Sequence, residues 1–207
     1  MTSKAVKKRI DVRESILREA TRLFGERGFG GVALRDIAKA CDIQLSTLSS
    51  HFALKLILQE AVFQRAVQII IKRSLPSRLG IGSPKQRFKR YLAKAVELML
   101  SDLPEMKVLD REFQELDKTS TFNIVVRTFG DRATMDSLTF LAKVAEDTNS
   151  EILKSISSVR LIQMAFASIY GVVKLRSVHR HVVGARAVSK AAITRDITLM
   201  FERMLRI

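Results

Sequence analysis

Cysteine, tryptophan and proline are scarce in this sequence, and the scarcity of cysteine excludes whole classes of structure. The 207 residues include one cysteine, no tryptophan and three prolines. A single cysteine excludes an intrachain disulfide framework and any zinc finger built on cysteines. It is also typical of proteins in a reducing compartment, so we expect a cytoplasmic location.

Long hydrophobic runs are missing as well, although 47% of the residues are hydrophobic. No run approaches the roughly 20 apolar residues that span a bilayer, and the first residues lack the apolar core of a signal peptide. We therefore expect a soluble protein with no membrane partner, whose apolar residues form a core.

The charge is strongly positive but dispersed along the chain. Lysine and arginine number 36 against 21 acidic residues, which gives a net charge of +15. Residues 72–94 carry eight basic side chains and no acidic one, whereas acidic side chains outnumber basic ones between residues 95 and 170. Such a balance favours an attraction to nucleic acid. The block at 72–94 is either an extra phosphate-binding surface or, as we favour, a solvated face.

The stretch from Ala33 to Phe52 contains two short helical patterns around a tight break. It predicts one helix over Leu34 to Ala40 and a second over Leu45 to His51, with the break at Cys41 to Ile43. Both apolar faces are narrow, so the two helices must bury against each other and a third, as in a helix-turn-helix. The apolar positions are Leu34, Ile37, Ala38 and Cys41 in the first helix, then Leu45, Leu48 and Phe52.

The second of these helices has a face suited to DNA. Its outward side chains are polar, uncharged and short, so its backbone can approach a duplex and its side chains can reach phosphate oxygens or base edges. A helix that merely faces water usually carries Glu and Lys instead. The alternative is a serine-rich surface helix with no partner. The outward residues are Gln44, Ser46, Thr47, Ser49, Ser50 and His51.

The surrounding sequence resembles the amino-terminal DNA-binding domain of the tetracycline-repressor (TetR) family of bacterial transcriptional regulators. The resemblance runs from Arg13 to about Leu58 and covers about a quarter of the chain. The matching motifs are R-E-S-I-L from Arg13, A-x-x-L-F from Ala20, R-G-F from Arg27, L-R-D-I-A from Leu34, T-L at Thr47, H-F at His51, and Lys55.

Four positions depart from the family pattern. Asp42 stands where the turn usually has Gly, but Asp tolerates a left-handed backbone better than most residues. Ser49 replaces a common phosphate-binding Tyr, Ala33 replaces a capping Ser or Thr, and Leu54 replaces a polar residue. These changes leave the fold in place and alter the expected phosphate contacts and operator sequence.

The resemblance implies an all-α protein with two domains. Residues 1–54 would form a three-helix helix-turn-helix DNA-binding domain, and residues 55–207 a larger helical domain for ligand binding and dimerisation. A helix from about Lys55 to Lys72 would join them, and the Pro- and Gly-containing segment Ser74 to Pro84 interrupts the helical periodicity. The expected DNA-binding residues are Arg35, Gln44, Leu45, Ser46, Thr47, Ser49, Ser50, His51 and Lys55.

The first residues and the Gly-rich segment after the first helix have simpler interpretations. Thr2 to Arg9 is a basic lead-in, either an arm that reaches DNA or a frayed terminus. The next helix carries an apolar face that ends in a segment with four glycines, where Gly28 would stop the helix and Phe29 would enter the core. That face comprises Val12, Ile16, Ala20, Leu23 and Phe24.

The carboxyl-terminal part is helical throughout and suggests a dimer. Small residues are frequent in its last two helices, and in this family such helices pair across a two-fold axis. Packing within one chain is the alternative. The apolar face predicted for the last helix comprises Val188, Ala192, Ile193, Ile197, Met200 and Met204.

Bulky flexible side chains in the middle of the chain are candidates for a ligand cavity, which the resemblance places among these helices. Met and Phe would suit a small apolar molecule, although at helical spacing each is also an ordinary core residue. The acidic balance of the region could instead favour a cationic inducer. The candidates are Met99, Met106, Phe113, Phe122, Phe129, Met135, Met164, Phe166 and Tyr170.

No catalytic or metal-binding pattern is present. His179 and His181 are two residues apart, so they do not share a helical face, and Cys41 is more simply a packing residue than a redox switch. We therefore expect neither an enzyme nor a cofactor, but a homodimeric repressor that a small ligand releases from a palindromic operator in the bacterial nucleoid. The alternatives are a non-specific architectural DNA-binding protein, or a helical module for ligands or proteins that has lost operator binding.

Overall fold

The computed structural model describes residues 3–74, 80–114, 160, 164, 167–173 and 189–205, and every regular element in these ranges is a helix. This confirms the all-α prediction. The chain forms two compact units, one of Met1–Ile70 with Asp102–Gly130 and one of Ile71–Ser101 with Asp131–Ile207. We call the first the head unit and the second the body unit.

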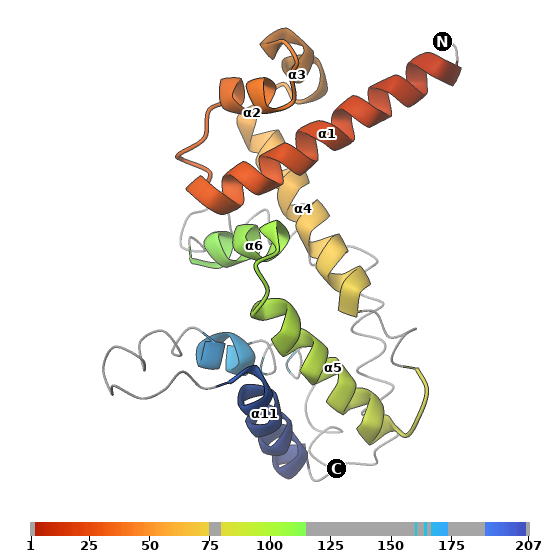
Figure 1. The fold of residues 1–207 in the computed structure, drawn as a ribbon, viewed down its shortest axis with the longest axis vertical. Helices are drawn as coiled ribbons and strands as arrows, with labels where there is room; N and C mark the ends of the chain where they lie inside the picture. Colours follow the sequence, from red (N-terminus) through yellow and green to blue (C-terminus); the bar gives the residue numbers. More distant parts are fainter. Residues whose placement is uncertain are drawn as a thin grey trace. The chain divides into compact units, whose positions relative to one another are not determined.

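Helix α1, Ser3–Arg27, begins the head unit (Figure 1). Ile16, Ala20 and Phe24 are buried on its predicted apolar face. Gly28 ends the helix with φ of +74°, and its N–H donates to the Phe24 carbonyl at 2.9 Å, as predicted. The basic lead-in lies within α1 from Ser3 onward, where the helix begins.

Helices α2, Leu34–Ala40, and α3, Leu45–His51, have the predicted bounds. The turn between them depends on Asp42, whose φ of +54° is left-handed, as expected. The Asp42 N–H donates to the Lys39 carbonyl at 3.2 Å, and the Ile43 N–H donates to the Ala38 carbonyl at 3.0 Å. These two bonds satisfy the last carbonyls of α2 and close the helix in a Schellman motif.

The start of α2 lacks the usual side-chain cap. Its N-cap residue is Ala33, which has no oxygen to offer. The Asp36 carboxylate instead accepts from the backbone N–H of Ala33 at 2.8 Å, which is the return half of a capping box. The helix therefore still begins at Leu34, although Ala33 stands where the family usually has a capping Ser or Thr.

Two further helices of the head unit lie in the described residues. Helix α4, Lys55–Ser74, buries Leu58, Val62 and Phe63, and its last residues enter the body unit. Helix α6, Pro104–Gln114, lies against the carboxyl-terminal end of α1 (Figure 1).

Polar bonds lock α6 to both neighbours. The Arg111 guanidinium donates to the carbonyls of Gly25 at 3.0 Å and Glu26 at 2.9 Å, at the end of α1. The buried Gln59 amide of α4 donates to both carboxylate oxygens of the buried Glu112, at 2.9 and 3.0 Å. Buried polar groups are costly unless paired, so these bonds fix how α6 sits in the head unit.

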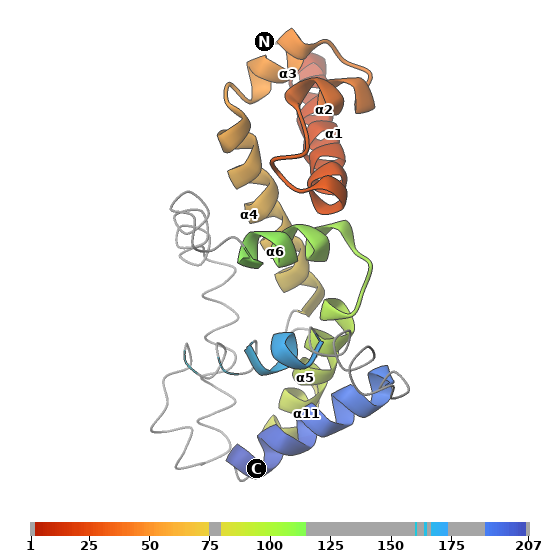
Figure 2. The same cartoon turned by 90° about the vertical axis from the view of Figure 1, so that its left-hand side faces the viewer.

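The body unit is built on α5, Pro84–Met99, and α11, Lys190–Leu205, which pack on each other (Figure 2). Ser83 caps α5, since its side chain accepts from the Gln86 N–H at 3.3 Å. The rings of Phe88 and Phe201 meet edge to face, with centroids 6.1 Å apart. Residues 167–173 are helical too.

The last helix corrects one prediction. Ile193 and Ile197 are buried as expected, but Phe201 completes the buried face, and Met200 is 44% exposed. Phe201 follows Ile197 by four residues and therefore lies on the same face, whereas Met200 lies beside it. The larger aromatic ring fills the space against Phe88.

Among the described helices, none combines the length and apolar character that crossing a membrane requires.

Candidate nucleic-acid interface

One face of helix α3 is buried against the core of the head unit, and the other face is exposed. Leu48 is completely buried and Phe52, directly after the helix, is 2% exposed. Because these two side chains face the core, the other side chains of the seven-residue helix face outward. The exposed side chains are Gln44, Leu45, Ser46, Thr47, Ser49 and Ser50, while His51 is half-buried.

Leu45 differs from the sequence interpretation that grouped it with the core positions Leu48 and Phe52. The structure leaves 37% of Leu45 exposed. At the first position of α3, its side chain precedes the point at which the helix meets the core. An apolar side chain therefore stands on an otherwise polar outward face.

Hydrogen bonds along α3 involve few of the outward groups. The Ser50 hydroxyl donates to the Thr47 carbonyl at 2.7 Å, and the Ser46 hydroxyl lies 3.5 Å from the Gln44 side-chain oxygen. Gln44 is the N-cap residue, yet its side chain makes no capping bond. The Gln44 amide is therefore not committed to the helix backbone.

Lys55, the first residue of α4, is bound to the head itself. Its Nζ donates to the Phe29 carbonyl at 2.6 Å and lies 4.2 Å from the centroid of the Phe29 ring. Burial lowers the pKa of the Lys55 ammonium, and the charge of Asp36 acts in the opposite direction. The predicted phosphate ligand is thus also a structural tie between α4 and the segment after α1.

Further basic residues of the head unit lie on α1 and α2. One of them, Arg13, was predicted only as part of a family motif. Arg35 and Lys39 are exposed on α2, one helical turn apart. Arg13 of α1 places its guanidinium carbon 5.2 Å from the centroid of the Phe52 ring. Its neighbour lies 39 residues away along the chain, so no local pattern could indicate this contact.

Cys41 is half-buried at the end of α2. Burial raises the pKa of its thiol, although a hydrogen bond with Ser15 opposes this effect. The thiolate is the reactive form of cysteine, so a raised pKa favours the packing role over a redox switch.

The predicted ligand residues fall in different parts of the molecule. Met99 ends α5 in the body unit and Met106 lies in α6 of the head unit, and both are partly buried. In the body unit Met164 is 40% exposed and Tyr170 is partly buried. Phe113 lies in α6. The predictions for Phe122, Phe129, Met135 and Phe166 lie outside the described residues.

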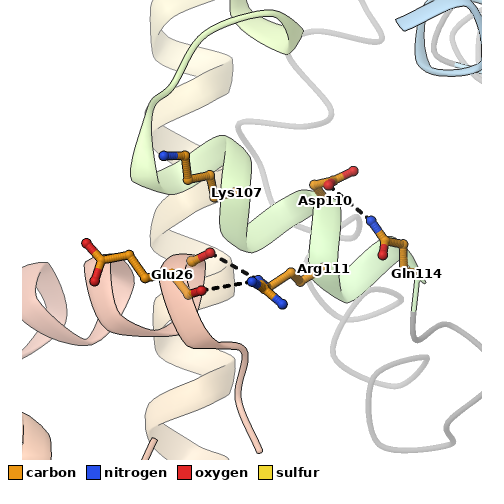
Figure 3. Close-up of a pocket in the computed structure, with 6 residues that line it drawn as sticks. Glu26, Lys107, Asp110, Arg111 and Gln114 are labelled. Carbon is orange, nitrogen blue, oxygen red and sulfur yellow. Dashed lines mark hydrogen bonds between the residues drawn. The ribbon is translucent and has the colours of Figure 1, made fainter. Parts of the chain in front are cut away.

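A polar notch of about 560 Å³ lies between α1 and α6 (Figure 3). Lys107, Asp110 and Gln114 line it from α6, and the Asp110 carboxylate accepts from the Gln114 amide at 3.0 Å. Arg111 points from the notch to the end of α1, where it caps the last carbonyls. The polar lining does not resemble the apolar cavity expected for a ligand.

Metal-binding side chains do not gather in the described ranges, where no group of three or more His, Cys, Asp or Glu residues could hold an ion.

The sequence of the head unit matches a known family. Residues 16–62 match the model of the bacterial regulatory proteins of the tetR family, which covers the last part of α1, all of α2 and α3 and the start of α4. The HTH-type transcriptional repressor DhaR of Mycobacterium sp. (strain GP1) is 29% identical over 93 residues. The match covers 44% of this chain and 46% of DhaR, so the chain spans about half the length of that relative.

Solved structures extend the likeness to the whole fold. A protein from Rhodococcus sp., described as a TetR-family transcriptional regulator, has a TM-score of 0.65 at 15% identity, over 94% of this chain and 98% of that one. AibR, solved in complex with isovaleryl coenzyme A and operator DNA, has a TM-score of 0.58 at 15% identity, over 91% and 97% of the two chains. At these identities the likeness shows a shared fold.

Proposed function

Because residues 16–62 match the model of the tetR family of bacterial regulatory proteins, we propose that this chain belongs to that family and is a sequence-specific DNA-binding transcriptional regulator. It acts as a repressor that a small apolar ligand releases from its operator. DhaR, which is related over part of its length, is named a transcriptional repressor, and AibR was solved with an operator and an acyl coenzyme A.

The observation that carries the proposal is the outward face of α3. Its exposed polar side chains are short, so the helix can enter a major groove without a steric or like-charge barrier. Buried Leu48 and Phe52 hold the helix rigidly on the core, which gives base contacts a fixed geometry. The proposed DNA-binding residues are Arg35, Gln44, Leu45, Ser46, Thr47, Ser49, Ser50, His51 and Lys55.

The dispersed positive charge gives less support to an architectural DNA-binding protein. In the basic block, Lys85 and Lys89 both pair with Glu202 of α11, at 3.6 and 2.5 Å. Lys94 pairs with Glu97 of its own helix at 2.8 Å. Because these cations already have acidic partners, they add less to non-specific phosphate binding than their number suggests.

The domain from residue 55 onward would bind the ligand and form the dimer. Reading a palindrome requires two heads related by a two-fold axis, and the last two helices are the proposed pairing surface. In the described part of these helices, Ala167 and Ala191 are exposed, and nothing lies within 4 Å of a Cβ added at Gly171. These small residues would allow a close approach of a second copy.

Ligand binding would act through α4, which begins in the head unit and ends in the body unit. A ligand that favours one position of α4 would change the separation of the two heads and lower the affinity for the operator. The proposal includes no enzymatic activity and places the protein in the bacterial cytoplasm, on the nucleoid.

The test of this function is the selection of bound duplexes from a random DNA pool at near-physiological salt, followed by sequencing. An enriched palindrome is the expected result. Binding without enrichment would support the architectural alternative, and no binding would support a helical module without an operator.

Thr47 then tests whether α3 is the reading helix. Thr47→Ala removes an exposed hydroxyl and is expected to weaken operator binding about tenfold per head while the melting temperature is unchanged. Thr194→Ala is the matched control, because the Thr194 hydroxyl donates to the Lys190 carbonyl of α11 at 3.0 Å. Equal affinities of the two variants would exclude this docking of α3.

A further inference from the structure

Arg13 connects the first helix to the end of α3. Its side chain is exposed, and its guanidinium carbon lies 5.2 Å from the centroid of the Phe52 ring. Phe52 is the residue that caps the end of α3 and is itself 2% exposed, so the ring is fixed in the core. A cation–π contact at an exposed site is a modest attraction that favours this position of the guanidinium.

Several other basic side chains of the head unit contact oxygen atoms. Arg18 and Arg22 pair with acidic residues of their own helix, and Arg65 lies 3.4 Å from Glu14 and 3.8 Å from Glu105. Carbonyl oxygens accept from Lys55 and Arg111. For Arg13, the ring of Phe52 is the contact that the described part of the structure shows.

This difference matters for the chemistry of Arg13. A cation–π contact draws on the charge of the guanidinium, and an aromatic ring has no carboxylate or carbonyl oxygen to take up its N–H donors. Those donors match a phosphate, which accepts two parallel N–H bonds from one guanidinium. An exposed guanidinium that a buried ring favours in one position, and whose donors no described oxygen takes up, is a favourable phosphate ligand.

We propose that Arg13 binds a phosphate of the DNA backbone beside the groove that α3 enters, and that Phe52 orients it. The inference rests on the proposed DNA-binding function and adds a contact from α1, outside the helix-turn-helix. Because a phosphate contact carries no base information, Arg13 sets affinity and register and leaves the sequence preference to α3.

The test compares the salt dependence of operator binding in Arg13→Met and wild type. Methionine keeps an unbranched apolar stem over Phe52 and removes the charge. Each lost phosphate contact lowers the slope of log affinity against log salt by about 0.9, so a dimer is expected to lose about 1.8. The enriched operator sequence is expected to stay the same, and affinity to fall about tenfold per head at near-physiological salt.

Arg18→Met is the matched control, because it removes an equal charge from an exposed arginine of the same helix. The Arg18 guanidinium lies 3.4 Å from the Glu19 carboxylate, and its side chain is 66% exposed. Its slope is expected to equal that of the wild type. Arg13→Lys, which retains the charge, is expected to keep most of the slope.

A wild-type slope in Arg13→Met would overturn the assignment of Arg13 while leaving specific operator binding in place. Should the methionine variant fail to fold, Arg13→Gln gives the same comparison, and a wild-type slope there would have the same meaning. If the wild-type protein selects no sequence from the pool, the proposed function fails first, and this inference fails with it.

Discussion

The Lys55 ammonium donates a hydrogen bond to the carbonyl oxygen of Phe29 at 2.6 Å and lies 4.2 Å from the centre of the same residue's ring. One side chain thus ties the start of α4 to the segment that follows α1. Hydrogen bonds to charged groups and cation–π contacts each stabilise a fold by about 1 kcal/mol or more. Lys55 is therefore part of the head's architecture as well as a candidate phosphate ligand.

Lys55→Met is expected to lower the free energy of unfolding by about 1–2 kcal/mol, because it removes both contacts and leaves the Phe29 carbonyl without this donor. Thermal unfolding followed by circular dichroism measures the effect. Lys39→Met, at an exposed position of α2, is the control and is expected to melt like the wild type. If Lys55→Met lost operator affinity at an unchanged melting temperature, Lys55 would act on DNA alone.

Leu45 is expected to read a thymine methyl group, the apolar group that a base pair offers in the major groove. Replacing the contacted thymine by uracil removes that methyl group and should weaken binding about fourfold per half-site, which corresponds to about 0.8 kcal/mol. Leu45→Ala should bind both duplexes equally. Fluorescence anisotropy with single thymine-to-uracil duplexes tests this, and a wild type that tolerates uracil everywhere would contradict it.

Asp42 is expected to be a suboptimal turn residue. Its φ of +54° strains a side chain that has a Cβ, so Asp42→Gly should raise the free energy of unfolding by about 0.5–1 kcal/mol. Asp42→Ala should lower it, because alanine has neither the freedom of glycine nor a local hydrogen-bonding group. Urea denaturation measures both variants. Destabilisation by glycine would mean that the Asp42 carboxylate contributes more than the backbone strain removes.

Glu202 is expected to make the body unit sensitive to acid. The hydrogen bond from Lys89 lowers the pKa of the Glu202 carboxyl below its ordinary value, and the charge of Lys85 adds to this effect. The stabilisation is therefore present above the ordinary pKa of a glutamate and is lost as the pH falls through the lowered value. Lys89→Met should raise the pKa of Glu202 in an NMR titration.

Lys94→Met is the control for that titration, because Lys94 pairs with Glu97 of its own helix and not with Glu202. Its Glu202 should titrate as in the wild type. An ordinary pKa for Glu202 in the wild-type protein would show that the contact with Lys89 is not maintained in solution.

The sequence predicts the helix-turn-helix well because its determinants are local. Apolar spacing and turn residues define α2 and α3, and a tolerated left-handed aspartate is enough to place Asp42 in the turn. The exposure of Leu45 could not be predicted in the same way, because at the first position of a seven-residue helix the periodicity does not distinguish a core position from an outward one.

The contacts that join distant segments were not predictable from any local pattern. Arg111 caps α1 from 86 residues away, and Gln59 pairs with Glu112 across 53 residues. From the sequence alone, a charged or amide side chain on an amphipathic helix is predicted to face solvent, because the helix that it contacts is not known. For the same reason, Arg13 could be recognised only as part of a family motif. Its contact with Phe52 could not be predicted.

The cap that Arg111 provides at the end of α1 has a consequence for the newborn chain. The ribosome adds Arg111, whose guanidinium donates to the carbonyls of Gly25 and Glu26, 86 residues after Gly25 and 85 residues after Glu26. Before α6 has been synthesised, these two carbonyls lack the Arg111 guanidinium as a donor, so the end of α1 is not yet joined to α6. A fragment that ends after α4 would contain α2 and α3 but would lack the hydrogen bonds from Arg111 to the end of α1.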